Sequence, residues 1–568
     1  MKTEYTLKFY EGHGGIGIRS FDDDENSKLD RVVTNSDKNV YAWKISDAFS
    51  QENAGALLSR YSRTASTARD IYLKEFYPNI NKGREFYQAW LLDYGDDSIQ
   101  EMVGGLPVSF EYVSNLAAKE IEDSRFASAI EKSSRYVPFD KKLPNGQYMF
   151  YTDKDIMESR FGDAYLSVMN GLFDSYSRHI SDMSGLIEEK NPIEEVKFSF
   201  SGRVMTMPEF TLSGADYGLS EKDLVKAYNN SVRANALDLL RDYLPMSTLT
   251  HVGISANARV YDGILTKMFS SPLGEARWLA ENAYGEIYKL APSVINGIKK
   301  KHGEEAIKFL MDKRDKISLD GILEDEKPLE TSSLSLFDYP GRGSMDPDAA
   351  ARNSLLSVIL YTGSYSLSLQ DSSDVAAGMS KDRQDKVISD YVGNRTNRRQ
   401  RPGRAFESLY YVFDIKNRVG IYRDLQRHRV GTQQRKMFST DLGYSVREQF
   451  AEIGIDEDYR EKMGEVTDLF NSLRKTLPYQ AQYAVTFGFN VRWYININAR
   501  ELFHICELRT TPQGHPDYRK VAQDMARVVE NVNPSVTKHM YFLNKENKEL
   551  GRLGSEIRMA VKKSALNG

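Results

Sequence analysis

Apolar and polar residues follow two kinds of pattern along this chain. Val108–Ala118 (VSFEYVSNLAA) and Tyr410–Val419 (YYVFDIKNRV) open with aromatic and β-branched residues and continue with residues common in helices. Each segment therefore predicts a strand that leads into a helix. Leu502–Leu508 and Val521–Val529 carry apolar residues at helical spacing, with a glycine and a proline between them. The pattern as a whole predicts an α+β fold class.

A segment without sustained periodicity, residues 317–346, is rich in Ser, Asp, Gly and Pro and predicts a linker. Short patterns recur in the same order on its two sides: Ala56–Tyr61 with Ser354–Ser357, Leu91–Gly95 with Ile388–Val392, Leu240–Pro245 with Leu473–Pro478, and Asn257–Arg259 with Asn498–Arg500. The fixed order indicates an ancient tandem duplication. We therefore expect one unit at residues 1–316 and a second at 347–568, each a β-sheet packed with helices.

The composition limits the possible functions. The chain has 568 residues, of which 40% are hydrophobic and 27% are charged, as in a folded protein of several domains. A formal net charge of −4 argues against a surface that binds nucleic acid as a whole. The single cysteine, Cys506, excludes a disulfide framework and predicts a reducing compartment, with the cytoplasm as the expected location. No apolar run of signal-peptide or membrane-spanning length occurs, so no membrane association is expected.

Arginine-rich segments are the main candidates for chemistry. In the run Arg427-His428-Arg429, neighbouring side chains point in different directions, so at least one should face inward or toward a ligand. The alternative is a solvated basic face. The segment Asn394–Arg404 holds five arginines, and it fits a flexible surface loop as well as a binding loop. Because arginine binds phosphate through a rigid fork of donors, this pattern favours an anionic small molecule such as a nucleotide.

Three other features predict structural roles. The glycine-rich run at residues 12–17 is not followed by a helical pattern, so we interpret it as a turn. His515 has no second histidine at ligand spacing, so it is expected to be a loop residue or a substrate contact, and no metal site is predicted. Cys506 lies in a mainly apolar helical segment, which predicts a packed core thiol.

The segment from Arg427 to Thr432 resembles the first half of the signature of flavin-dependent thymidylate synthases. That signature reads Arg-His-Arg-x-x-Ser-x-x-x-x-Ser-x-Arg-Tyr, often with Glu two places before the second Ser. In the C-terminal unit its second half is replaced, since Arg435, Met437 and Ser439 stand where Glu, Ser and Arg are expected.

The N-terminal unit resembles the other half of the signature. Asp123 and Ser124 replace its first Arg and His, whereas the later positions match at Ser128, Glu131, Ser133, Arg135 and Tyr136. Together the two units supply one complete signature.

Further family elements are divided in a similar way. Ser98 and Glu101 resemble the family's His-x-Ser-x-x-Glu-His segment, and both units carry an Arg-x-x-Leu-Pro element, at Arg241 and Arg474. The family's final polar residues are complete in the C-terminal unit alone, as Asn498, Arg500, His504 and Arg509; in the N-terminal unit Met268 takes the place of the last arginine. Arg241 precedes Asn257 by 16 positions and Arg474 precedes Asn498 by 24, which predicts an insertion near Phe487–Tyr494.

The resemblance implies an FAD enzyme that methylates dUMP reductively to dTMP, with methylenetetrahydrofolate and NADPH as co-substrates and with sites between subunits of a tetramer. Two tandem chains would then form a homodimer that imitates the tetramer. The implied substrate-binding residues are Glu131, Ser133, Arg135 and Arg241 on one wall, and Arg427, Arg474 and Arg509 on the other. The implied FAD-binding residues are Ser98, Glu101, Arg427, His428, Arg429, Asn498, Arg500 and His504.

The resemblance also implies catalytic roles for Arg509 and Ser133, with Arg509 stabilising negative charge on the pyrimidine carbonyl. This chemistry requires no cysteine nucleophile. Two alternatives stay open, because Asp424, Arg435 and Met437 depart from the family pattern. One is reductive alkylation of another pyrimidine nucleotide, and the other is a flavin- or nucleotide-binding protein without turnover.

Overall fold

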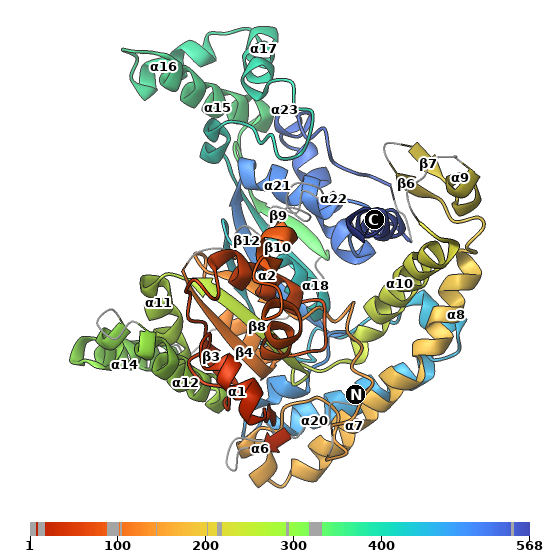
Figure 1. Cartoon of the computed structure of the whole chain (residues 1–568). Coiled ribbons are helices and arrows are strands. Elements are labelled where there is room, and N and C mark those ends of the chain that lie inside the picture. The colour runs from red at the N-terminus through yellow and green to blue at the C-terminus, as the bar shows by residue number, and fades with distance from the viewer. Residues whose placement is uncertain are drawn as a thin grey trace. The chain divides into compact units, whose positions relative to one another are not determined.

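The computed structural model confirms the predicted α+β class (Figure 1). It describes residues 7–9, 17–87, 102, 105–143, 145–200, 203–212, 219–290, 295–316, 332–546 and 550–567. Ser98, Glu101 and most of the glycine-rich run at 12–17 lie outside these residues. No helix in the described part of the chain is long and apolar enough to cross a bilayer.

Two compact units share the chain, and each contains segments from both sides of the predicted linker. Unit 1 comprises residues 1–187, 233–327 and 439–489, and unit 2 comprises 188–232, 328–438 and 490–568. The linker predicted at 317–346 contains a strand, β9 (Leu334–Asp338), which pairs with β10. Residues 317–331 are outside the described part.

The sheet of unit 1 is antiparallel and has the order β3 (Val40–Ala42), β4 (Leu106–Ser114), β8 (Leu249–Ala256), β5 (Ser128–Glu131). Leu106 pairs with Ala256 and Ser114 with Leu249, and a bulge interrupts the register where Tyr112 takes a φ of +54°. Both faces of β4 and β8 are buried. Helices α5, α11 and α12 cover one face, and α2 and α3 cover the other.

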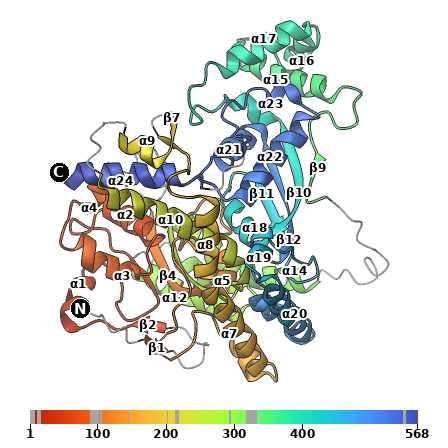
Figure 2. The same ribbon diagram turned by 90° about the vertical axis from the view of Figure 1, so that its right-hand side faces the viewer.

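The sheet of unit 2 has the equivalent order, β9, β10 (Tyr410–Arg418), β12 (Asn490–Asn498), β11 (Thr432–Arg435), and is also antiparallel (Figure 2). Here burial alternates along the strands. Phe413, Trp493 and Ile495 belong to the buried face, whereas polar side chains of the other face stay partly exposed. One side of this sheet is therefore a polar surface.

The predicted transition from strand to helix occurs in both units. Strand β4 continues into α5 (Asn115–Ile121), and β10 continues into α18 (Val419–Leu425). The repeated asparagines have the same role in both units. Through their side chains, Asn257 caps the N-terminus of α11 (Ala258–Phe269) and Asn498 caps that of α21 (Ala499–Arg509).

The remaining elements surround these sheets. Unit 1 contains β1 (Leu7–Phe9), β2 (Gly17–Arg19), α1 (Asp23–Leu29), α2 (Gln51–Tyr61), α3 (Ala68–Ile71), η1 (Tyr72–Phe76), α4 (Lys82–Tyr87), α6 (Lys154–Glu158), α7 (Gly162–Arg178), η4 (Arg241–Tyr243), α12 (Gly274–Leu290), η5 (Asn296–Lys299), α14 (Lys301–Lys316), α19 (Glu448–Glu452), α20 (Asp456–Leu473) and η7 (Gln480–Ala484). Unit 2 contains β6 (Phe198–Phe200), β7 (Arg203–Met205), α9 (Met207–Leu212), α15 (Pro347–Gly363), α16 (Leu369–Ala377), α17 (Lys381–Val392), η6 (Arg404–Ser408), α22 (Pro516–Glu530), α23 (Pro534–Thr537) and α24 (Leu553–Asn567). Helices α8 (Ile180–Lys190) and α10 (Glu221–Leu240) contain residues of both units.

Within unit 1, the segments that precede β8 and β12 pair with each other about a local two-fold axis. Pro245 forms a β-bridge with Thr486, and each lies four residues before its strand. The backbone hydrogen bonds around the bridge come in reciprocal pairs: Met246 N to Val485 O at 2.8 Å with Phe487 N to Leu244 O at 2.9 Å, and Ser247 N to Tyr483 O at 3.0 Å with Gly488 N to Asp242 O at 3.1 Å.

This symmetry corrects the predicted alignment of the two Leu-Pro elements. If Pro245 corresponds to Thr486, then Arg241 corresponds to Gln482 and not to Arg474. Arg474 instead caps the C-terminal end of α20. The additional residues of the C-terminal half therefore lie between α20 and η7, not near Phe487–Tyr494, because the strand itself begins at Asn490.

Candidate functional site

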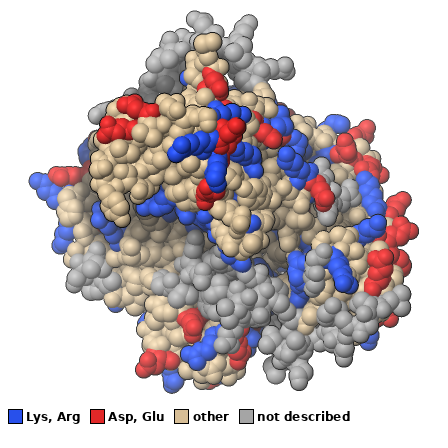
Figure 3. Space-filling view, turned by 90° about the horizontal axis from the view of Figure 1, so that it is seen from above, with Lys and Arg blue, Asp and Glu red and all other residues tan. Residues whose placement is uncertain are grey.

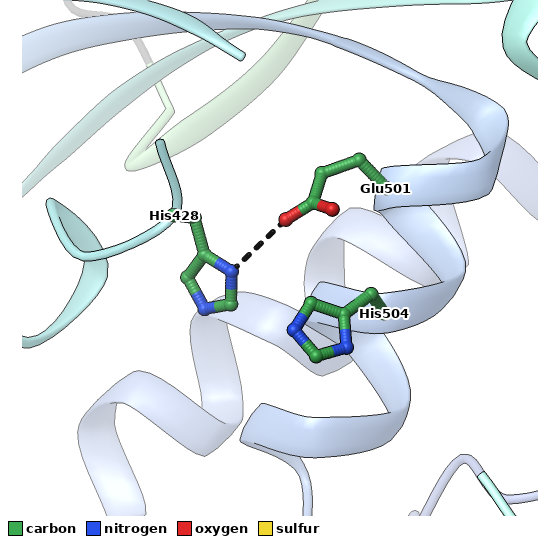
Figure 4. Close-up of side chains that lie close together, drawn as sticks. All are labelled: His428, Glu501 and His504. Atoms are coloured by element: carbon green, nitrogen blue, oxygen red, sulfur yellow. Dashed lines mark hydrogen bonds and ion pairs between the residues drawn. The ribbon is translucent and has the colours of Figure 1, made fainter. Parts of the chain in front are cut away.

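Unit 2 brings four polar side chains together at helix α21. Three of them, His428, Glu501 and His504, are drawn in Figure 4. His428 follows α18, whereas Glu501, His504 and Arg509 lie on α21. The Asn498 side chain accepts a hydrogen bond of 2.9 Å from Glu501 N, which fixes the start of this helix. Because Glu501 and His504 are three residues apart, both project toward His428.

The contacts of His428 define its tautomer. Arg509 Nε donates a hydrogen bond of 2.7 Å to His428 Nε2, and His428 Nδ1 lies 3.2 Å from Glu501 Oε1. Since a guanidinium only donates, Nε2 must be the nitrogen without a proton, and Nδ1 then donates to the carboxylate. His428 is 5% exposed, while Arg427 is exposed and Arg429 half-buried. The prediction that one residue of this run faces inward is confirmed.

Both histidines of this group are neutral. Burial lowers the pKa of His428 well below its usual value, and the positive charges of Arg509, Arg429 and Arg401 lower it further. Burial likewise lowers the pKa of His504 to about 3, although Glu501 opposes this shift. Burial raises the pKa of Glu501, against the effect of His504 and the nearby arginines. Arginine side chains therefore supply the positive charge around this group, and the two imidazoles add no positive charge.

The donor set suits an anion better than a metal cation. One ligand atom from each of His428, Glu501 and His504 lies within 4.8 Å of the others, which is a spacing that metal sites use. However, His428 Nε2 accepts from Arg509, and His504 Nδ1 lies 3.2 Å from Arg401 Nη2, which donates to it. Those lone pairs are engaged, and the adjacent guanidiniums repel a cation.

The arginine-rich loop, residues 394–404, is fixed to this region by ion pairs and backbone contacts. Arg395 is buried and forms a bidentate ion pair with Glu507 of α21, with one contact of 2.8 Å. Arg500 Nε donates to Pro402 O at 2.8 Å, and Arg500 Nη1 lies 3.5 Å from Glu407. These contacts favour the interpretation as a binding loop over that as a flexible surface loop, because they hold Arg401 beside His504.

Unit 1 contains a second group of predicted residues. Arg135 Nε lies 3.4 Å from Asp238 Oδ1, and Arg241 Nη1 lies 3.7 Å from the same atom. Asp238 and Arg241 are buried, and Ser133 is anchored by its backbone N–H, which donates to Ser62 O at 2.9 Å. Two guanidiniums thus share one carboxylate.

Glu131 is engaged in a buried ion-pair group of its own. Its Oε2 lies 3.1 Å from Lys119 Nζ, which also contacts Glu122 Oε2 at 2.5 Å. All three side chains are at most 5% exposed. The fold therefore orients the Glu131 carboxylate toward Lys119.

The structure places the remaining predicted residues as follows. Arg474 is 46% exposed and contacts Asp441 at 2.8 Å. Cys506 is buried, its pKa is raised by burial, and its Sγ donates to Ala522 O, so the prediction of a core thiol is confirmed. His515 caps α22, with Nδ1 accepting from Asp517 N at 3.0 Å.

Sequence reasoning missed Glu501 and Arg401. The signal for Glu501 was available, because Glu501 stands three residues after a helix-capping asparagine and three before His504. Arg401 was one of five arginines in its loop, and the fold alone selects it.

The polar residues that α21 contributes to this group have no polar counterparts on the related helix α11 of unit 1. Counted from the capping asparagines, Glu501, His504 and Arg509 correspond to Val260, Gly263 and Met268. Met268 is fully buried in the apolar core of unit 1. The two related helices thus differ, since one carries polar side chains where the other carries apolar residues or glycine.

Comparisons with known proteins give a consistent family. A family model described as thymidylate synthase complementing protein matches residues 49–293 and 351–535, more than half of the chain. A UPF0159 protein of Chlamydia muridarum is 32% identical over 95% of this chain and 98% of its own length. UPF0159 proteins of Chlamydia pneumoniae and Thermoplasma acidophilum are 33% and 30% identical, over 93% and 89% of this chain and over 96% and 98% of their own lengths.

A solved structure was also matched, titled as a UMP/dUMP methylase from Streptomyces cacaoi bound with 5-Br dUMP. It is 14% identical, and the match covers 38% of this chain and 96% of that one with a TM-score of 0.29. At that score the likeness supports no conclusion about this chain.

Proposed function

The chain belongs to the thymidylate synthase complementing protein family, and from this premise we propose that it is an FAD-dependent enzyme that methylates dUMP reductively to dTMP. Family membership supports a nucleotide methylase of the thymidylate synthase type. The observation that carries the proposal further is the neutral His428, which Arg509 and Glu501 orient in a region rich in arginine.

The residues around His428 fit the anionic part of FAD. His428 and His504 add no charge, so the positive charge of the region comes from arginines, which bind phosphate groups well. We assign FAD binding to the residues that the family signature marks: Arg427, His428, Arg429, Asn498, Arg500 and His504, together with Ser98 and Glu101. Bound FAD would carry reducing equivalents from NADPH to the one-carbon unit that methylenetetrahydrofolate provides.

We assign the dUMP phosphate to the group that Arg135 and Arg241 form in unit 1. Two guanidiniums converge on Asp238 there, and guanidinium groups bind phosphate through charge-assisted hydrogen bonds. Ser133 would donate its hydroxyl, and Glu131 would lie near the sugar or base. The family resemblance also assigns Arg427 and Arg509 to dUMP, whereas Arg474 loses this support because Arg241 corresponds to Gln482.

We assign Arg509 the electrostatic role in the reaction. Its Nε is held by His428, so the orientation of its guanidinium is set before substrate binds. A fixed guanidinium beside the pyrimidine carbonyl would stabilise the negative charge that develops there as C5 becomes nucleophilic. Because Cys506, the single cysteine, is buried in the core, its position supports a reaction without a thiol nucleophile.

A second candidate is reductive alkylation of another pyrimidine nucleotide. Arg435 and Met437 stand where the signature has Glu and Ser, and Met437 is 46% exposed. The Arg435 guanidinium lies 4.1 Å from the centroid of the Phe438 ring, so its position is defined by packing. Exchange of an acidic for a basic side chain would change which base is recognised.

Methylation of deoxyuridylate by the purified protein tests the proposal. We expect turnover with dUMP, FAD, NADPH and methylenetetrahydrofolate, and a large loss in Arg135→Ala and in Arg427→Ala. The matched control is Arg527→Ala, because Arg527 is exposed on α22 and far in sequence from the signature. Flavin and nucleotide binding without turnover on any pyrimidine nucleotide would instead indicate a binding protein, and turnover with another nucleotide would favour the second candidate.

Retained nucleotide binding in both variants would place the site elsewhere.

We further propose that the two units arose by duplication, because their sheets have the same strand order and their connecting segments form reciprocal hydrogen bonds.

A further inference from the structure

The arginine-rich loop, residues 394–404, brings two guanidinium groups to the side chains around His428. Arg401 Nη2 donates a hydrogen bond of 3.2 Å to His504 Nδ1. Burial is the main reason for the low pKa of His504, and the charges of Arg401 and Arg398 add to it, so both arginines lie near this imidazole. Within the described part of the chain, no carboxylate lies at ion-pair distance from either arginine. Both therefore keep donors that an external anion can use.

Two other arginines of the loop do form ion pairs. Arg395 pairs with Glu507, and Arg404 Nη2 lies 2.9 Å from Glu407 Oε2. The Arg404 side chain is 86% exposed and nevertheless has a carboxylate partner, so exposure alone does not explain the lack of one elsewhere in the loop. The two arginines without a carboxylate partner are those whose charge acts on His504.

Contacts on both sides of Arg398 hold the loop in place. Arg395 Nη1 donates to His539 O at 3.0 Å, in addition to its ion pair. Gln400 Oε1 accepts a hydrogen bond of 3.1 Å from Thr396 Oγ1, which closes the loop across Arg398. Because these contacts exist before any ligand binds, a ligand of this loop loses less affinity to the ordering of the backbone.

The charge pattern identifies the kind of ligand. The formal net charge of the chain is −4, and Lys and Arg side chains gather in groups beside acidic and uncharged surface in Figure 3. Positive charge is thus a local feature. A guanidinium binds phosphate oxygens through a rigid fork of donors. Two such groups three residues apart on one loop fit a diphosphate, which presents oxygens on two adjacent phosphorus atoms.

We propose that Arg398 and Arg401 bind the diphosphate of a dinucleotide. This inference rests on the proposed function, whose reaction uses two dinucleotides, FAD and NADPH. FAD is the expected ligand, because two residues assigned to it contact this loop. His504 contacts Arg401, and Arg500 Nε donates to Pro402 O at 2.8 Å. The family resemblance marks neither Arg398 nor Arg401, so the pair extends the set of cofactor-binding residues.

Fluorescence titration of the flavin-free, full-length chain with FAD tests the proposal. We expect Arg398→Ala and Arg401→Ala each to raise the dissociation constant for FAD by about tenfold, because each removes charge-assisted hydrogen bonds to phosphate. Arg401→Lys should recover part of the loss, since lysine keeps the charge without the fork of donors. The matched control is Arg404→Ala, which removes an arginine of the same loop that has its own carboxylate and should bind FAD like the wild type. Thermal unfolding establishes that each variant is folded.

Titration of the same proteins with NADPH distinguishes the two dinucleotides. A comparable loss of affinity for NADPH, with unchanged binding of FAD, would assign the diphosphate site to NADPH. Unchanged affinity of both alanine variants for both dinucleotides would overturn this inference and leave the proposed function standing. A wild-type chain that binds neither dinucleotide would overturn both.

Inorganic pyrophosphate provides a measurement that does not depend on the flavin ring. It should raise the melting temperature of the flavin-free wild type more than that of the double variant Arg398→Ala with Arg401→Ala. Sodium chloride at equal ionic strength controls for screening. A change that only displaced His504 would leave pyrophosphate binding intact, so this measurement separates phosphate contact from a structural effect. Equal stabilisation of the two proteins by pyrophosphate would contradict a diphosphate site at these arginines.

Discussion

Arg509 Nε donates a hydrogen bond of 2.7 Å to Nε2 of His428, which is 5% exposed. This contact determines the tautomer of His428, because a guanidinium donates hydrogen bonds and cannot accept one. It also joins the loop after α18 to the last turn of α21. Residues that are 81 positions apart in the sequence thus form one orienting network with Glu501.

Removing the Arg509 donor should weaken both the fold and the cofactor site. In Arg509→Ala, the buried Nε2 of His428 loses its hydrogen-bond donor, which costs about 1–3 kcal/mol. We expect a lower free energy of unfolding by denaturant and weaker FAD binding by fluorescence titration. Arg527→Ala, which removes an exposed arginine of α22, should change neither. Unchanged stability in Arg509→Ala would mean that water satisfies His428.

His504 should make the protein less stable in acid. Its folded-state pKa is about 3, first because of burial, while an unfolded histidine titrates near 6.5. Between these values the unfolded chain binds a proton that the folded chain excludes, so stability falls as the pH drops from about 6.5 toward 3. Urea unfolding of wild type and His504→Asn at pH 7 and pH 5 should show a smaller loss in the variant. Equal losses would assign the acid sensitivity to other groups.

The ion pair of Arg395 with Glu507 should be essential for holding the arginine-rich loop. Both side chains are at most 2% exposed, so removing one leaves a buried charge without its counter-ion. We expect Arg395→Ala to cost about 3–5 kcal/mol in the free energy of unfolding. The double variant Arg395→Met with Glu507→Leu should recover much of this loss, because no charge is then buried. A double variant as unstable as the single one would contradict this explanation.

Local patterns in the sequence predicted the local parts of the fold. The transitions from strand to helix at Ser114 and Arg418, and the repeated asparagines at 257 and 498, depend on neighbours within a few residues. The exchange of residues 188–232 and 439–489 between the units depends on long-range packing, which no local pattern encodes. The alignment of Arg474 with Arg241 failed for the same reason. It rested on a Leu-Pro pair that follows both arginines in the sequence, whereas the bridge between Pro245 and Thr486 shows that the two arginines are not equivalent.

The candidate site was predictable to a similar extent. The family resemblance pointed to His428 and Arg509 separately, and their direct contact required the fold. Arg135 and Arg241 were also predicted, but their shared partner Asp238 was not, although it lies three residues before Arg241 on the same helical segment. A carboxylate between two arginines that are predicted to bind phosphate is difficult to foresee, because it neutralises part of the positive charge that the phosphate would contact.

That carboxylate provides a direct test of the nucleotide site. Asp238 is 3.4 Å from Arg135 and 3.7 Å from Arg241, so Asp238→Ala leaves the buried Arg241 without this counter-charge. We expect a loss of about 3 kcal/mol in the free energy of unfolding. A bound phosphate should restore part of it, because its charge replaces the missing carboxylate. Addition of dUMP, or of inorganic phosphate, should therefore raise the melting temperature of Asp238→Ala more than that of the wild type.

The double variant Asp238→Ala with Arg135→Ala separates rescue at this site from general salt effects. It removes one of the two guanidiniums that would hold the phosphate, so the additional stabilisation by dUMP should disappear while stabilisation by an excluded salt such as sulfate at high concentration remains. Potassium chloride at equal ionic strength controls for screening. Equal stabilisation of the wild type, Asp238→Ala and the double variant by dUMP would mean that the nucleotide binds away from Arg135 and Arg241. The division of the signature between the two units would then have to be explained without a phosphate site at these two arginines.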